Sequence, residues 1–123
     1  LRWAIDFASP GGTVVVAWVW DATPLAVGAD AFFFPDASDL AADRFHHLVD
    51  SVADQARLRD VTLEREFVRG TPRSALASQA ENADIVVVGA RGHRAVGAAL
   101  LGSVSTWLLH HLHRPIAVVP LTV

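Results

Sequence analysis

The sequence has no cysteine, which excludes a disulfide framework, thiol catalysis and thiolate metal sites, and which is compatible with a reducing cytoplasm. Charge is also scarce: 19% of the 123 residues are charged, the formal net charge is -3 and the basic residues are scattered, which argues against a nucleic-acid partner. Long apolar runs are missing too, since the least polar stretch, residues 95–109, contains Gly, Ser and Thr and is too short to span a bilayer. No secretion signal is visible. We therefore expect a soluble, cytoplasmic domain with no nucleic-acid or membrane partner.

Apolar residues, in contrast, make up 52% of the chain, enough for a substantial core in one domain. Their spacing alternates between helical and strand periods. The expected elements are a helix over Leu1–Ala8, a buried strand over Thr13–Trp20, an irregular segment over Asp21–Ser38, an amphipathic helix over Leu40–Arg59, an edge strand over Val61–Val68, a helix over Pro72–Asn82, a buried strand over Ile85–Gly89, a helix over Val104–His113 and a buried strand over Ile116–Val119. Such alternation predicts an α/β fold with an open parallel sheet and helices on both faces.

A glycine-spaced segment joins the last two expected strands. Gly89 ends the first of them, Gly92 follows three residues later, and Gly102-Ser103 comes after nine further residues and opens a helix. Glycine permits positive φ and has no Cβ, so we expect backbone N–H groups near Gly89 and Gly92 to approach an anion closely. In open parallel sheets, ligands bind beyond the carboxyl ends of strands, where Gly89 is expected to lie.

The start of the expected helix supplies a second group of donors. The first amides of a helix are unpaired and lie at the positive end of its dipole. We therefore expect Gly102, Ser103 and Val104 to present N–H groups to phosphates, and the hydroxyls of Ser103 and Ser105 to add to them. Arg91, His93 and Arg94 contribute a favourable local field.

Other interpretations of these glycines were weighed. A plain loop explains many glycines through their backbone freedom alone. A P-loop is excluded because Ser103 stands where the lysine of Gly97-x-x-x-x-Gly102-Lys is required, and no Gly-x-Gly-x-x-Gly follows a strand. The segment therefore predicts a phosphate site of a different type.

The spacing Gly, two residues, Gly, nine residues, Gly-Ser resembles the nucleotide-binding motif of universal stress proteins, and it is complete at Gly89, Gly92, Gly102 and Ser103. The resemblance implies a five-stranded, Rossmann-like sheet of the adenine nucleotide alpha hydrolase-like type. It also implies a central strand ahead of Leu1, ending in an Asp-Gly-Ser-like turn whose aspartate helps to hold adenosine. Residues 1–123 are accordingly interpreted as a single universal stress protein domain that is N-terminally incomplete.

The same resemblance implies a ligand and the residues that hold it. The ligand is ATP with Mg²⁺. Residues around ribose and phosphates are Gly89, Gly92, Gly102, Ser103, Val104 and Ser105, and Val19 and Val88 at strand ends touch adenine. For both valines, an ordinary core position remains an equal alternative, because buried strands are rich in valine.

Other polar groups do not indicate catalysis. His110, His111 and His113 end a helix, where the dipole favours histidine, and no further metal ligand is evident beside them. Glu64 and Glu66 share one side of an edge strand and are expected to face solvent. No base to activate serine and no acidic motif for catalytic Mg²⁺ is present, so at most slow ATP hydrolysis is expected.

The sequence thus predicts an ATP-binding, stress-response regulatory module rather than a fast enzyme. The resemblance also implies a homodimer through the last strand, Ile116–Val119, or pairing with a tandem domain. The alternatives are a dimerisation scaffold of the same family without nucleotide, and a slow ATPase.

Overall fold

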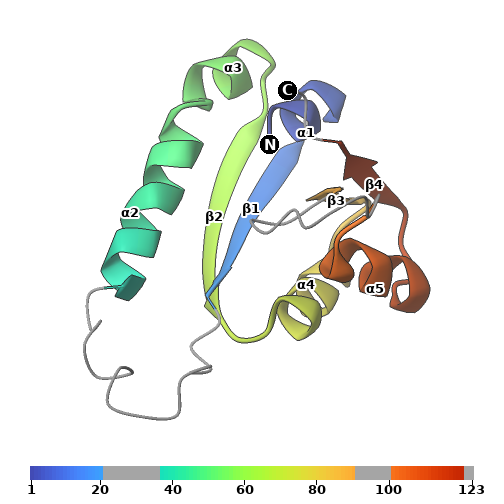
Figure 1. The fold of residues 1–123 in the computed structure, drawn as a ribbon. Coiled ribbons are helices and arrows are strands. Elements are labelled where there is room, and N and C mark those ends of the chain that lie inside the picture. Colours follow the sequence, from blue (N-terminus) through green and yellow to red (C-terminus); the bar gives the residue numbers. More distant parts are fainter. Residues whose placement is uncertain (21–36, 91–100, 121–123) are drawn as a thin grey trace. The chain divides into compact units, whose positions relative to one another are not determined.

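The computed structural model describes residues 1–20, 37–90 and 101–120, and the chain forms two compact units, Leu1–Thr71 and Pro72–Val123. The first unit contains α1 (Arg2–Phe7), β1 (Thr13–Trp20), α2 (Ala37–Asp50), α3 (Ala53–Leu58) and β2 (Thr62–Arg69). The second contains α4 (Pro72–Ala80), β3 (Val86–Gly89), α5 (Ser103–His111) and β4 (Ile116–Val119) (Figure 1). Each expected element is present, which confirms the alternation. No helix in the described part of the chain is both long and apolar enough to cross a membrane.

Both sheets are parallel. In the first unit β1 pairs with β2 from Thr13 opposite Thr62 to Trp20 opposite Arg69. In the second unit β3 pairs with β4 from Val86 opposite Ile116 to Gly89 opposite Val119. Helices connect the paired strands in both units, because a parallel pair requires a crossover. The predicted α/β class with parallel strands is therefore confirmed; the described strands form two two-stranded sheets.

The strands are less buried than the sequence predicts. The described side chains of β3 and β4 are half-buried or exposed, and in β1 Val15 is 46% exposed. Alternation accounts for β1: Val14 packs against the core of the first unit, and its neighbour Val15 points to the opposite face. The expectation of fully buried strands is wrong, because each strand has one partner in its two-stranded sheet and keeps accessible surface.

The predicted long helix over Leu40–Arg59 is divided in two. The Ser51 hydroxyl donates to the Leu48 carbonyl (2.6 Å), and the Val52 amide donates to Val49 three residues back rather than four (3.2 Å). Serine competes for backbone partners in this way and favours turns over helix interiors. The break turns Val52 inward, where it is 2% exposed, so one amphipathic pattern forms α2 and α3.

The core of the first unit joins α1 and α3 to the start of β2. Its fully enclosed members are Ile5, Val52, Ala56 and Val61. Gln55 on α3 fixes α1 from the polar side, since its amide donates to the Arg2 carbonyl (3.2 Å) and to the Asp6 carboxylate (2.9 Å). These contacts explain why a helix of six residues, too short to be stable alone, is formed.

An aromatic cluster joins α2 to the sheet of the first unit. Phe45 is 1% exposed, and its ring centroid lies 6.0 Å from that of Trp18 on β1 and 6.1 Å from that of Phe67 on β2. Leu40 and Leu48, which the sequence also assigned to the buried face, are 55% and 44% exposed. That part of the prediction is wrong, because the buried stripe of α2 follows Ala41, Phe45 and Val49.

An ion pair on the surface of the first unit links α2 to β2. Arg65 bonds to the Asp50 carboxylate and approaches the Nδ1 atom of His46 (2.8 Å). The hydrogen bond from Arg65 lowers the pKa of Asp50 below its ordinary value. A lowered carboxyl pKa contributes stability that is present above the unfolded value of about 4 and is lost as pH falls through the folded value.

We therefore expect Asp50→Asn to lower the free energy of unfolding at pH 7 and to have no effect well below pH ~4. Arg65→Gln removes the same pair from the other side and is expected to show the same pH dependence. Urea denaturation of the three proteins from pH 2 to 7 measures this. A difference between wild type and Asp50→Asn that stays constant with pH would contradict it.

Candidate functional site

The carboxyl end of β3 is connected to the start of α5 by backbone hydrogen bonds within the second unit. The Ala90 amide donates to the Val119 carbonyl on β4 (2.9 Å), and the Gly102 amide donates to the Ala90 carbonyl. Ala90 itself is 8% exposed. The two glycines that flank this connection, Gly89 and Gly102, thus lie on adjoining stretches of backbone, as the motif predicts.

The first turn of α5 provides amides without helical acceptors. The helix begins at Ser103, with Gly102 as its extended N-cap (φ -72°, ψ 167°), and the Thr106 amide donates to the Gly102 carbonyl (3.0 Å). The amides of Ser103, Val104 and Ser105 precede that bond and have no acceptor four residues back. No acidic side chain lies in this turn, so nothing there opposes an anion at the positive end of the helix dipole.

The hydroxyls of this turn fall into two kinds. Ser103 is exposed, and its hydroxyl has no hydrogen-bond partner among the described residues. Ser105 is 3% exposed, and its hydroxyl donates to the Gly89 carbonyl (2.7 Å). Ser103 is therefore available to a ligand, whereas the Ser105 hydroxyl already has an acceptor inside the protein.

Two details of the expected site differ from the structure. Gly89 belongs to the β3 ladder and does not have positive φ; the described glycines that do are Gly11 and Gly70. The Gly102 amide, expected to face an anion, donates to Ala90 instead. Both differences have one reason: the parallel ladder and its continuation to α5 use these backbone groups to join secondary structure.

The remaining residues expected at the site are distributed as follows. Val88, half-buried, pairs with Val118 in the second unit, and Val104 is half-buried in the first turn of α5. Val19, also half-buried, pairs with Val68 in the first unit. Gly92, together with Arg91, His93 and Arg94, lies outside the described residues. The structure thus brings Gly89, Gly102, Ser103 and Ser105 to one place.

The histidines near the end of α5 have a structural setting. The His111 ring stacks on Trp107 (centroids 4.2 Å apart), and its Nδ1 atom lies 2.7 Å from the Trp107 carbonyl. Within residues 1–20, 37–90 and 101–120, no three His, Cys, Asp or Glu side chains are grouped to hold a metal ion. Glu64 and Glu66 are exposed on β2, as expected.

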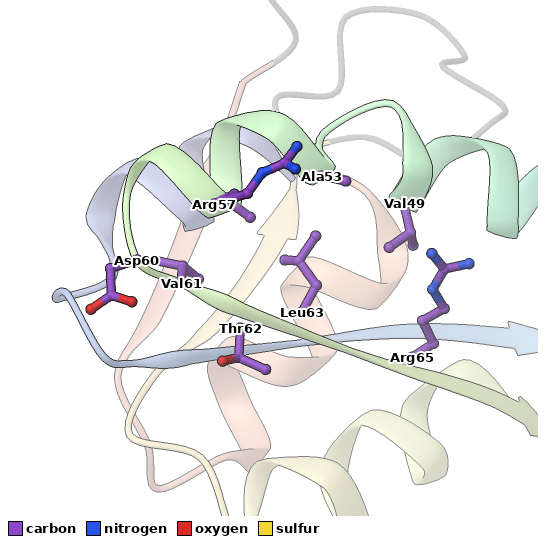
Figure 2. Close-up of a pocket in the computed structure, with 9 residues that line it drawn as sticks. Val49, Ala53, Arg57, Asp60, Val61, Thr62, Leu63 and Arg65 are labelled. Atoms are coloured by element: carbon purple, nitrogen blue, oxygen red, sulfur yellow. The ribbon is translucent and has the colours of Figure 1, made fainter.

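A separate depression of about 390 Å³ lies in the first unit, between α2, α3 and β2 (Figure 2). Val49, Val61 and Leu63 contribute apolar surface, and Arg57 and Arg65 stand at its margin. Both guanidinium groups are engaged, Arg57 with Asp54 and Arg65 with Asp50. The sequence analysis did not anticipate this depression, which follows from the divided helix; its charged groups pair with neighbours, and we assign no function to it.

Alternating parallel strands and helices, with a helix start beside the carboxyl end of a strand, define an α/β protein of Rossmann-like class. The family model for the Universal stress protein family matches residues 1–120. The chain belongs to the universal stress protein family.

Relatives of known family include universal stress protein Slr1101 of Synechocystis sp. (strain ATCC 27184 / PCC 6803 / Kazusa), 38% identical over 68 residues that cover 54% of this chain and 63% of that protein. Universal stress protein Rv1996 of Mycobacterium tuberculosis (strain ATCC 25618 / H37Rv) is 36% identical over 78 residues, 63% of this chain and 24% of that protein. The matched segments thus span less than two thirds of the length of either relative.

Solved structures share the fold. Protein MJ0577 superposes with a TM-score of 0.77 at 18% identity, covering 99% of this chain and 85% of that one. A universal stress protein family protein from Arabidopsis thaliana, At3g01520, has AMP bound; its TM-score is 0.62 at 16% identity, with 98% and 75% covered. A universal stress protein in complex with cAMP gives 0.50 at 23% identity, with 91% and 98% covered. At these identities the likeness establishes the fold.

Proposed function

We propose that this chain binds ATP through its triphosphate at the start of α5. The observation that carries the proposal is the first turn of that helix: free amides at Ser103 and Val104 and an exposed, unpartnered Ser103 hydroxyl lie beside the carboxyl end of β3. Helix starts of this kind favour phosphate through both their donors and their dipole. The adenine nucleotides bound in two structural neighbours, AMP and cAMP, support the ligand class.

The adenine end involves residues of both units in this proposal. Val88 at the end of β3 and Val19 near the end of β1 contact the base, and Gly89 and Gly92 allow the backbone to approach ribose and phosphates. Ser103, Val104 and the first turn of α5 hold the phosphates. In this role the chain is a nucleotide-dependent regulatory module of the stress response, acting in the cytoplasm where ATP is plentiful, as a dimer paired through Ile116–Val119 or with a tandem domain.

Magnesium enters this proposal with the nucleotide. The described residues around the start of α5 include no carboxylate, and the acidic residues of the second unit, Glu81 and Asp84, precede β3 at its opposite end. These donors do not form a magnesium site of their own. The ion would therefore be held by the phosphates, with Ser103 as the hydroxyl nearest to them. No group in the described part of the second unit is placed as a general base, which fits binding with slow hydrolysis at most.

Amide chemical shifts test the placement of the phosphates. We expect MgATP to shift the amide resonances of Ser103 and Val104 strongly, because a phosphate replaces water at these N–H groups. Adenosine, which has no phosphates, is the matched control; it is expected to shift Val88 and to leave Ser103 unchanged. Titration of isotope-labelled protein with each ligand measures both. Binding of MgATP without a shift at Ser103 or Val104 would contradict the proposal.

A further inference from the structure

Ser105 holds an unusual position among the hydroxyl residues of α5. It is the buried polar residue of the described chain, 3% exposed, and its hydroxyl donates across to the Gly89 carbonyl at 2.7 Å, sixteen residues earlier in sequence. Gly89 is the last residue of β3, and Ser105 lies in the first turn of α5. This hydrogen bond therefore joins a strand end to a helix start through a side chain.

A backbone bond reinforces the same junction. The Gly102 amide donates to the Ala90 carbonyl, and Ala90 is in turn bonded to Val119 of β4. The start of α5 is thus fixed to the β3–β4 pair at two neighbouring carbonyls, those of Gly89 and Ala90. A buried acceptor is costly to leave unsatisfied, so the Ser105 bond strongly favours this arrangement of the two elements.

The neighbouring hydroxyl provides a contrast. Thr106 is exposed, and its hydroxyl donates to the Gly102 carbonyl (2.9 Å) within its own helix. That carbonyl also accepts from the Thr106 amide (3.0 Å), so it keeps a partner if the hydroxyl is removed. Ser105, unlike Thr106, connects two elements, and its Gly89 acceptor has no second donor among the described residues.

We propose that Ser105 is a positioning residue: its bond to Gly89 sets the start of α5 so that the Ser103 and Val104 donors meet the phosphates. This inference rests on the proposed function. It replaces the expected role of Ser105 as a phosphate ligand, because its hydroxyl proton is already donated inside the protein. The phosphate contacts belong to Ser103, and Ser105 acts on affinity through geometry.

The test is calorimetric titration of ATP and of adenosine into wild type, Ser105→Ala, Ser105→Thr and Thr106→Ala. Ser105→Ala is expected to weaken ATP binding about fivefold, the factor that corresponds to one ordinary hydrogen bond. Adenosine affinity is expected to stay within about twofold of wild type, since adenosine lacks the groups that meet α5. Ser105→Thr keeps a hydroxyl and should restore ATP affinity, and Thr106→Ala should leave it unchanged.

Each other outcome overturns the inference. Equal ATP affinity in Ser105→Ala and wild type removes the positioning role, and parallel losses for ATP and adenosine indicate general destabilisation instead. If Ser105→Ala does not fold, Ser105→Cys keeps the side-chain size with a weak S–H donor and takes its place in the same comparison. Amide hydrogen exchange without ligand separates the two proposals: faster exchange at Gly102 in the variant supports the junction, whereas a wild-type chain that binds no ATP rejects the proposed function and any effect of Ser105 on it.

Discussion

Replacing Phe45 by alanine is expected to lower the free energy of unfolding by about 3–5 kcal/mol, the usual cost of removing a buried aromatic side chain. Phe45 is 1% exposed and touches both Trp18 and Phe67, so it joins α2 to both strands of the first unit. Neither neighbour can fill the space without leaving its strand position, and a cavity results. Urea denaturation followed by circular dichroism measures the change.

Leu48 is the matched control for this prediction. It lies on the same helix but is 44% exposed, so Leu48→Ala is expected to cost less than about 1 kcal/mol. Equal losses for the two variants would show that Phe45 does not anchor α2 to the sheet. Equal stability of Phe45→Ala and wild type would contradict the description of the first unit.

The largest expected effect on binding comes from Gly102→Val, which is expected to weaken ATP binding about 100-fold, or about 2.8 kcal/mol. The φ and ψ angles of Gly102 are in the extended region that any residue adopts, so valine does not strain the backbone there. Its branched side chain instead stands beside the first free amides of α5, where the phosphates are proposed to lie. The Gly102 amide is still able to donate to Ala90, so the fold is expected to persist.

Gly102→Ala is the graded control, because it adds one methyl group at the same place. Its ATP affinity is expected to lie between those of wild type and Gly102→Val. Adenosine affinity should be similar in all three proteins, and thermal unfolding should be similar as well. A valine variant that binds ATP as tightly as wild type would place the phosphates elsewhere.

Most of the fold could be predicted from the sequence because the apolar periods are strong. Thr13–Trp20 and Ile116–Val119 were predicted with the observed bounds, and Pro72 was predicted to open α4. The divided helix was not predicted, since the apolar pattern continues through Ser51 and Val52 without interruption. The break depends on one serine hydroxyl and one backbone bond, which periodicity does not register.

At the candidate site, the sequence located the elements but did not distinguish ligand donors from structural ones. Ser103 and Ser105 have the same side chain two residues apart, and both were assigned to the phosphates. Helical rotation places them differently: Ser103 is exposed, while Ser105 turns into the protein toward Gly89. Likewise, glycine at position 89 suggested positive φ, yet the residue continues a strand. Which groups are already bonded follows from three-dimensional contacts alone.

The most direct test of the central claim is calorimetric titration of MgATP into the unmodified chain, with inorganic phosphate and adenosine as separate titrants. The account predicts a saturable one-site isotherm for MgATP, with much weaker binding of either fragment, because the nucleotide combines base contacts with phosphate contacts at the start of α5. No heat with MgATP, in a sample shown to be folded by circular dichroism, would contradict the account and favour a scaffold role for this domain.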